Sequence, residues 1–283
     1  LVPKLDTTVG WKMFETKYLY GTDRAVKGQF ERIARTAAKH LAGIGKEEEG
    51  YEKFFELMWN GWLSLSTPVM SNMGTDRGMP VSCSGSYVGD SVAQFHKVRT
   101  ETVVLTKNGF GTASYLGDIR SRGSVISKGG KASGVLPVFK GFVQDSRDTS
   151  QGQTRRGAWA GYLPIDHGDF DEIADFIMNE IDDCNVGWNI TDAFIALLNK
   201  GDAEATRRFQ KAMKLKLVTG RGYFFFVDKA NRRRPEMYKK HNLDVKSPQL
   251  CNEIMLHSSK LYTYTCVLSS MNLARYNEWK DTN

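Results

Sequence analysis

Cysteine is scarce in this sequence, and long apolar runs are missing. The chain has four cysteines in 283 residues, at positions 83, 184, 251 and 266, and no CxxC pair. This usage excludes a disulfide scaffold and argues against a structural zinc site, so no bound metal is expected. No run of about 18 apolar residues occurs, so the sequence predicts no membrane span.

The amino terminus also lacks a targeting signal. It begins Leu1-Val2-Pro3-Lys4, without the basic-then-apolar pattern of a secretory signal, so a cytoplasmic protein is expected. The first residue is not Met, which suggests a trimmed start. With 41% hydrophobic and 25% charged residues, the composition is typical of a soluble globular chain.

The net charge of +7 suits an anionic partner. The only basic triplet is Arg232-Arg233-Arg234, and neither a zinc-finger nor an RNP signature accompanies it. A basic nucleic-acid-binding protein is therefore a weak alternative. We expect nucleotide phosphates as ligands and no nucleic-acid partner.

Helical periodicity dominates the first 75 residues. Apolar side chains at 3–4 spacing over 28–41 and an aromatic stripe over 51–62 predict two helices. From about residue 80, short strand-like runs alternate with helical ones, which indicates an α/β sheet with crossover connections. The expected domains are a helical region, 1–75, and an α/β domain, 76–283.

Particular elements of the second region follow from local patterns. Strands are expected at 80–84 and 262–268, and the apolar run 223–227 fits a buried parallel strand. Helices are expected over 92–105 and 206–218, and another begins over 135–142. A further helix is expected to start after Asp169, which would be its N-cap. The segment 123–134 holds four glycines, which is long for an inert connection and suggests a functional loop.

Two cysteine contexts near the end of the chain carry the strongest chemical signal. They are Leu250-Cys251-Asn252-Glu253 and Thr265-Cys266, and a third, Ser82-Cys83, lies far upstream. In an extended segment residues two apart share a face, so Cys251 and Glu253 could both face one substrate. Cys83 and Cys266 could meet as a dithiol. Such a set favours radical or redox chemistry over hydrolysis, whereas Cys184 is expected to be a small buried hydrophobe.

With these contexts, an ordered set of short strings resembles the catalytic large (alpha) subunit of ribonucleotide reductase, class I-like. The strings, in chain order, are Ser66-Thr67-Pro68, Ser82-Cys83, Gly89-Asp90-Ser91, Lys107-Asn108-Gly109-Phe110-Gly111, Ile119-Arg120, Ser150-Gln151-Gly152 with Arg155, Thr219-Gly220-Arg221, Leu250-Cys251 with Glu253, and Cys266 with Asn272-Leu273. The resemblance implies a helical region followed by the first half of a ten-stranded α/β barrel. A finger loop with Cys251 at its tip and the start of the second half would follow.

The resemblance also implies roles in the reaction. Cys251 matches the cysteine that becomes a thiyl radical, and Glu253 matches the general base for the ribose 3′-hydroxyl. Cys83 and Cys266 match the pair that reduces the 2′ position and ends as a disulfide. Gln249 stands where the family has Asn, with the same amide groups one methylene further out. The positions that match substrate-binding residues are Thr67, Ser82, Asn108 and Gly109.

A specificity-effector site is implied as well. Asp90 would accept hydrogen bonds from a nucleoside, and Arg120 would bind effector phosphate. The family's second phosphate-binding Arg appears as Ser127, and Lys128 beside it could substitute as a point charge. The full set of implied effector residues is Asp90, Ser91, Arg120, Lys128, Gln151 and Arg155.

Cofactors and partners follow from the same resemblance. The chain is expected to bind no cofactor, only nucleoside triphosphate or deoxynucleotide effectors, and a separate metal-containing small subunit would supply the radical. A thioredoxin- or glutaredoxin-type protein would reduce the disulfide, and the large subunit would form a homodimer. A complementary polypeptide would supply the second half-barrel, as in a split, phage-type subunit. Two alternatives stay open: a nucleotide-binding regulatory fragment that is inactive on its own, and a cobalamin-dependent reductase.

Overall fold

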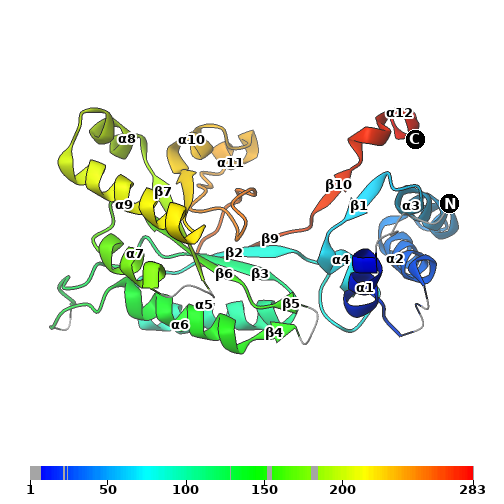
Figure 1. Cartoon of the computed structure of the whole chain (residues 1–283), viewed down its shortest axis with the longest axis horizontal. Coiled ribbons are helices and arrows are strands. Elements are labelled where there is room, and N and C mark those ends of the chain that lie inside the picture. The colour runs from blue at the N-terminus through cyan, green and yellow to red at the C-terminus, as the bar shows by residue number, and fades with distance from the viewer. Residues whose placement is uncertain are drawn as a thin grey trace. The chain divides into compact units, whose positions relative to one another are not determined.

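The computed structural model describes residues 8–21, 23, 25–127, 129–151, 155–179 and 184–282, except the side chains of residues 8, 150, 151 and 155. The chain forms two compact units, whose elements are labelled in Figure 1. The first comprises Leu1–Ser82, Gln151–Arg156 and Val267–Asn283, and the second comprises Cys83–Ser150 and Gly157–Cys266. The domain boundary expected after residue 75 stays a prediction.

The first unit is built on two packed helices, α2 (Val26–Leu41) and α3 (Glu47–Trp59). These confirm the two helices expected from the apolar stripes. Helix α3 ends before Trp62, because Gly61 takes a left-handed φ of 66° that closes the last turn. The hydrophobic core of the first unit also includes residues of α1 (Thr8–Lys17). The buried residues of this core are Phe14, Val26, Phe30, Ile33, Ala34 and Met58.

Short elements complete the first unit. Strand β1 (Leu63–Leu65) pairs antiparallel with β10 (Ser269–Met271), and helix α4 (Thr67–Asn72) follows β1. The remaining short elements are η1 (Leu273–Arg275) and α12 (Tyr276–Trp279). Strands β4 (Ser150–Gln151) and β5 (Arg155–Arg156) form a separate two-stranded sheet.

The second unit is organised around a six-stranded sheet with the order β8-β7-β6-β3-β2-β9. Five strands are parallel and follow one another in chain order, whereas β9 runs antiparallel to β2. This arrangement makes β8 and β9 the two edges. The strands are β2 (Cys83–Tyr87), β3 (Gly111–Tyr115), β6 (Trp159–Pro164), β7 (Asn185–Ile190), β8 (Tyr223–Phe226) and β9 (Tyr264–Cys266).

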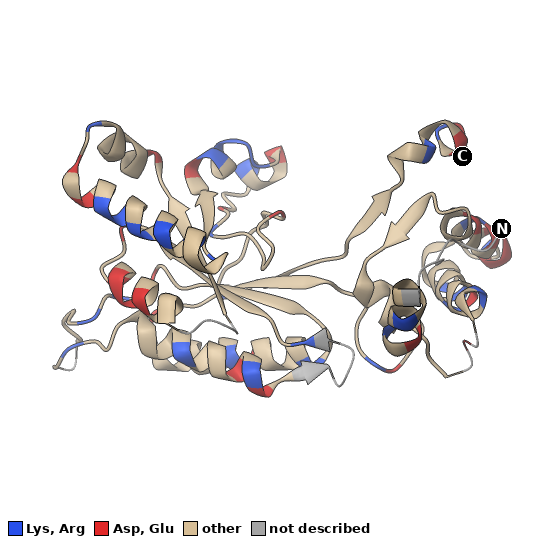
Figure 2. Ribbon diagram, in the orientation of Figure 1, with Lys and Arg blue, Asp and Glu red and all other residues tan. Residues whose placement is uncertain are grey.

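Helices connect the parallel strands and cover one face of this sheet (Figure 1). Crossovers between sequential parallel strands have one hand, so they leave the helices on the same side. The helices are α5 (Val92–Lys107), α6 (Val135–Asp148), α7 (Phe170–Asn179), α8 (Asp192–Asn199) and α9 (Ala203–Thr219). Figure 2 shows acidic positions on α7 near basic ones on α9, where Asp171 binds Arg207 at 2.8 Å and Lys211 at 2.8 Å.

The two faces of the sheet differ in chemistry because side chains alternate along each strand. On β6, Trp159 and Leu163 enter the helix-covered core, whereas Ala160 and Tyr162 lie on the opposite face. That opposite face is rich in tyrosine. Leu250 packs against it from the segment 241–263, which contains neither helix nor strand.

Helices α10 (Val227–Arg232) and α11 (Glu236–Lys240) precede this segment. None of the helices in the described part of the chain is both long and apolar enough to cross a membrane.

Three local predictions are corrected. The strand expected at 80–84 begins at Cys83, three residues late, because 80–82 do not pair. Within the run 223–227, residues 223–226 form a parallel strand and Val227 begins α10. Of the strand residues only Phe225 is buried, and Phe226 is 48% exposed, because β8 is an edge. Asp169 does not cap α7. Its carboxylate instead accepts hydrogen bonds from the backbone N–H groups of Arg122 and Val135.

Candidate functional site

Three of the four cysteines meet at the amino-terminal end of β2. Cys83 opens β2 and lies directly opposite Cys266 of β9 in the antiparallel register. The Cys83 thiol is hydrogen-bonded with the thiols of Cys251 and Cys266. None of the four cysteines forms a disulfide, and Cys184 is buried apart, in the helix-covered core. The structure therefore brings together the three cysteines that the sequence singled out.

Cys83 and Cys266 differ in how readily they ionise. The hydrogen bond with Cys251, the hydrogen bond with Cys266 and then burial raise the pKa of Cys83 far above the usual thiol range. The pKa of Cys266 is lowered, because its thiolate accepts a hydrogen bond from Cys83. Since the thiolate is the attacking species in thiol–disulfide exchange, Cys266 is the nucleophilic member of the pair.

Cys251 lies on a tight loop that closes on itself at Gln249 and Ile254. The Gln249 N–H donates to the Ile254 carbonyl at 3.1 Å, and the Ile254 N–H donates to Gln249 Oε1 at 2.8 Å. Asn252 takes a left-handed φ of 69° at the turn. The expectation of an extended segment is wrong here, yet Cys251 and Glu253 are both exposed on this turn.

Two buried tyrosines support the loop from the sheet. The Tyr162 hydroxyl donates to the Gln249 carbonyl at 3.0 Å, and the Tyr264 hydroxyl donates to the Ser247 carbonyl at 3.2 Å. Burial raises the pKa of both phenols, so they stay protonated and act as donors. Sequence reasoning missed both residues. The alternation along 159–163 was the available signal, since it places Tyr162 opposite Trp159 and Leu163.

The predicted substrate residues of the second unit lie just before β3. Asn108 ends α5, and its side-chain Nδ2 donates to the Val104 carbonyl at 2.8 Å. Gly109 has a φ of 98°, a conformation that favours glycine. Gly111 lies opposite Cys83 in the β2–β3 register. Asn108 and Gly109 therefore come just before the residue of β3 that pairs with one of the three thiols.

The other two predicted substrate residues belong to the first unit. The Thr67 hydroxyl lies 3.3 Å from the hydroxyl of Tyr18, at the start of α4. The Ser82 hydroxyl donates to the hydroxyl of Ser66 at 3.0 Å. Ser66 is thus a polar neighbour that the sequence-based residue set omitted, although it stood next to Thr67 in the motif.

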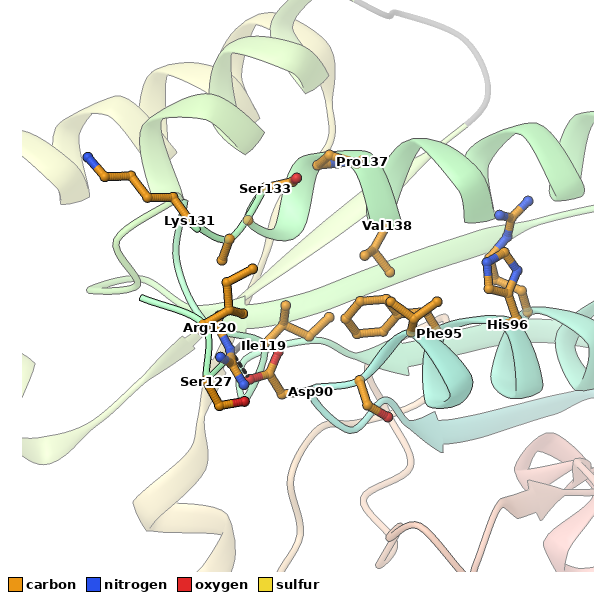
Figure 3. Close-up of a pocket in the computed structure, with 16 residues that line it drawn as sticks. Asp90, Phe95, His96, Ile119, Arg120, Ser127, Lys131, Ser133, Pro137 and Val138 are labelled. Atoms are coloured by element: carbon orange, nitrogen blue, oxygen red, sulfur yellow. Dashed lines mark hydrogen bonds and ion pairs between the residues drawn. The ribbon is translucent and has the colours of Figure 1, made fainter. Parts of the chain in front are cut away.

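A separate cavity of about 810 Å³ lies between α5, α6 and the loop that joins β3 to α6 (Figure 3). Asp90 and Arg120 line it and form an ion pair at 2.5 Å. Phe95 and Val138 supply part of its apolar wall. A cavity of this size, with an apolar wall and a few charged groups, suits a small organic ligand such as a nucleotide.

The remaining predicted effector residues have different positions. Ser91 lines the cavity, and its hydroxyl caps α5 by accepting the Gln94 N–H at 3.3 Å. Lys128 lies outside the described residues. The backbones of Gln151 and Arg155 are in β4 and β5, but their side chains also lie outside the described part.

The loop 121–134 lines much of the cavity. It doubles back on itself through an antiparallel bridge between Val125 and Lys131, and Asp169 binds backbone N–H groups at both of its ends. This position fits the functional loop that its glycines suggested. Lys131, His96 and the Asp145-paired Arg99 also line the cavity and were missed, because single basic residues carry no sequence signal.

Comparisons with protein families cover nearly the whole chain. The family model described as the all-alpha domain of ribonucleotide reductase matches residues 4–78. The model described as the ribonucleotide reductase barrel domain matches residues 81–207 and 199–283.

Individual relatives agree with these models. The Actinobacillus ureae class Id ribonucleotide reductase alpha subunit has a similar structure, with a TM-score of 0.88 and 36% identity over 99% of this chain and 51% of that one. This likeness confirms the expected helical region followed by a half-barrel. A Frog virus 3 (isolate Goorha) protein named as a ribonucleoside-diphosphate reductase large subunit is 29% identical, over 88% of this chain and 46% of its own length.

The name of a third relative includes a cofactor. The vitamin B12-dependent ribonucleoside-diphosphate reductase of Thermoplasma acidophilum is 27% identical over 79% of this chain and 31% of its own length. The chain thus spans about half the length, or less, of these relatives.

Proposed function

Because this chain belongs to the large-subunit family of the ribonucleotide reductases, we propose that it carries the thiol centre of an enzyme that reduces ribonucleoside diphosphates to deoxyribonucleoside diphosphates. The observation that carries the proposal is the meeting of Cys83, Cys251 and Cys266, with Glu253 exposed on the same loop as Cys251. A lone buried cysteine would be a packing residue, but three adjacent thiols outside any disulfide form a redox unit.

The proposed reaction uses these thiols in two roles. Cys251, as a thiyl radical, takes the 3′ hydrogen atom of the ribose and becomes a thiol, while Glu253 accepts the 3′-hydroxyl proton. The 2′-hydroxyl leaves as water. Cys83 and Cys266 lose two electrons and two protons and become a disulfide, one hydrogen leaving in the water and the other remaining on C2′. Glu253 returns its proton to the 3′ oxygen, and Cys251 returns its hydrogen atom to C3′ and is again a thiyl radical.

The ionisation of the dithiol supports its regeneration by an external dithiol protein. The lowered pKa of Cys266 makes it the better leaving thiolate when the Cys83–Cys266 disulfide is attacked at Cys83. A thioredoxin- or glutaredoxin-type reductant has the required chemistry. In the same proposal, a separate metal-containing subunit supplies the radical and the large subunit forms a homodimer. A second polypeptide supplies the other half of the barrel.

We further assign the cavity at Asp90 and Arg120 to a nucleoside triphosphate or deoxynucleotide effector. The cavity holds the cations Arg120 and Lys131, which suit phosphate, and the α5 N-terminus at Ser91 adds a favourable dipole. The apolar wall suits a base or deoxyribose. The ion pair between Asp90 and Arg120 would have to open or rearrange for Arg120 to bind phosphate directly.

Cysteine replacement in the reconstituted enzyme tests the proposal. We expect Cys251→Ser to abolish ribonucleotide reduction, because a hydroxyl does not carry the radical at an accessible energy, while effector binding is unchanged. Cys184→Ser is the matched control, because Cys184 is buried outside the thiol cluster, and it should retain turnover. Turnover in Cys251→Ser would refute the assignment.

A cobalamin-dependent reductase is the second candidate, and the likeness to the Thermoplasma acidophilum protein favours it. The likeness to the class Id subunit is higher in identity and in coverage, which is why we place the radical source on a separate subunit. Reduction assayed with either adenosylcobalamin or a radical-generating subunit separates the two. Activity with adenosylcobalamin alone would select the second candidate.

A further inference from the structure

Gln249 is the residue that holds the Cys251 loop closed. Its backbone and side chain both bind Ile254, through the 3.1 Å bond from its own N–H and the 2.8 Å bond to its Oε1. Its carbonyl accepts from the Asn252 N–H at 3.1 Å and from the Tyr162 hydroxyl at 3.0 Å. One residue therefore ties the two ends of the loop together and fastens the loop to β6.

The burial of the Gln249 side chain argues against a direct contact with a bound substrate. The residue is 0% exposed, and its Nε2 has no hydrogen-bond partner among the described residues. A buried, unpaired amide donor is unfavourable, and an apolar side chain of similar length such as Met would avoid that penalty. What Met would lose is the oxygen that binds the Ile254 N–H. The bond to Ile254 is therefore the favourable contribution of this side chain.

We propose that Gln249 is a positioning residue, which sets Cys251 against Cys83 by closing the loop 249–254 with its amide oxygen. Tyr162 assists, because its hydroxyl binds the Gln249 carbonyl. This inference rests on the proposed function for its role in catalysis, but the geometry itself can be measured without turnover. Loss of the Gln249–Ile254 bond would let Cys251 leave hydrogen-bonding distance of Cys83.

Disulfide trapping in the full chain measures that geometry. In a Cys266→Ser background, the azo compound diamide oxidises Cys83 and Cys251 to a disulfide and is itself reduced to the hydrazine. We expect Gln249→Met to slow this trapping at least tenfold. Gln249→Glu keeps an oxygen acceptor in the same place and should restore most of the rate below the pKa of the introduced carboxyl group. Tyr162→Phe keeps the ring and should slow trapping several-fold.

The control is Gln29→Met in the first unit. Gln29 is also 0% exposed, and its Nε2 donates to the Met70 carbonyl at 2.7 Å, so its loss removes a comparable buried amide without touching the loop. Its trapping rate should equal that of the parent. Equal trapping rates in parent, Gln249→Met and Tyr162→Phe would overturn the inference.

Steady-state kinetics separate a positioning role of Gln249 from a role in substrate binding. In the reconstituted enzyme, Gln249→Met should lower kcat and leave KM nearly unchanged. A raised KM with unchanged trapping would instead assign the amide to substrate and overturn the positioning role. Slowed trapping by Gln249→Met, together with a parent chain that shows no reductase activity even after reconstitution with its complement and a radical source, would count against the proposed function alone.

Discussion

At the residue scale, the thiol centre is asymmetric. Cys83 sits between two thiols and is buried, whereas Cys266 receives a hydrogen bond that stabilises its thiolate. The two members of the dithiol are therefore chemically distinct before any substrate arrives. The β2–β9 register places the two residues face to face, and the hydrogen bond with Cys251 is the largest cause of the raised pKa of Cys83.

The asymmetry predicts the pH dependence of alkylation. The pKa of Cys266 is lowered, so its initial rate with iodoacetamide should level off below the ordinary thiol pKa of about 8.5. The pKa of Cys83 is raised, so its rate should keep rising with pH across the accessible range. Residue-level mass spectrometry at substoichiometric reagent measures both rates, and the urea-unfolded chain is the control. The reverse order of titration would contradict the structure.

A second residue-scale prediction concerns Gly187 of β7. A Cβ at this position would lie 2.0 Å from the Tyr162 ring, so Gly187→Ala should destabilise the chain by about 1–3 kcal/mol. Gly43→Ala is the control: its nearest neighbour would be 3.8 Å away, and its effect should stay within about 0.5 kcal/mol. Urea unfolding measures both. Equal stability of the two variants would show that Tyr162 can move freely.

At the element scale, the cavity at Asp90 and Arg120 depends on how the loop 121–134 is held. Asp169 is 4% exposed, and its two oxygens bind the N–H groups of Arg122 at 2.8 Å and Val135 at 2.7 Å. Glycine is required at position 134. A Cβ at this position would lie 2.4 Å from the Asp169 carboxylate, and the φ of Gly134 is 78°. A single carboxylate thus fixes both ends of the loop 121–134.

We therefore expect Asp169→Asn to weaken deoxynucleoside triphosphate binding. Asn offers one acceptor oxygen in place of two, which leaves a buried N–H unpaired and lowers the free energy of unfolding by about 1–3 kcal/mol. Isothermal titration calorimetry and urea unfolding test the two effects. The exposed Asp166→Asn should change neither quantity. Wild-type affinity in Asp169→Asn would separate the loop from the effector site.

At the scale of the whole molecule, the sheet of the second unit ends in two open edges. In the described part of the chain, β8 and β9 each have a single neighbouring strand, and Phe226 on β8 is 48% exposed. Unpaired edges attract further strands. The relatives are about twice as long as this chain or longer. In the proposed function, a polypeptide that matches their remaining residues supplies the further strands.

This openness predicts that residues 1–283 alone will not reduce ribonucleotides. Activity should appear when a polypeptide covering the rest of the relatives' length is added with the radical-generating subunit. Size-exclusion mass measurement and a reductase assay of the mixture test this, and the chain with the radical subunit but no complement is the control. A fully active monomer of residues 1–283 would contradict the prediction.

Residue types and their spacing along the chain were enough to identify the family, the alternation of strands and helices in the second unit, and the three thiols. Motifs such as Leu250-Cys251-Asn252-Glu253 are local and can be identified without a structure. Apolar periodicity alone located α2 and α3. Those features depend on residue type and spacing along the chain, which a sequence states directly.

The interactions between groups far apart in the sequence became visible in the folded chain. It showed that Cys83 contacts both other thiols, that Asp169 holds the loop 121–134 instead of capping α7, and that Gln249 closes the Cys251 loop. These contacts join residues from different elements, or depend on a turn whose shape Asn252 sets with a left-handed φ. No local pattern encodes them, because hydrogen bonds and pKa shifts arise from through-space proximity and burial.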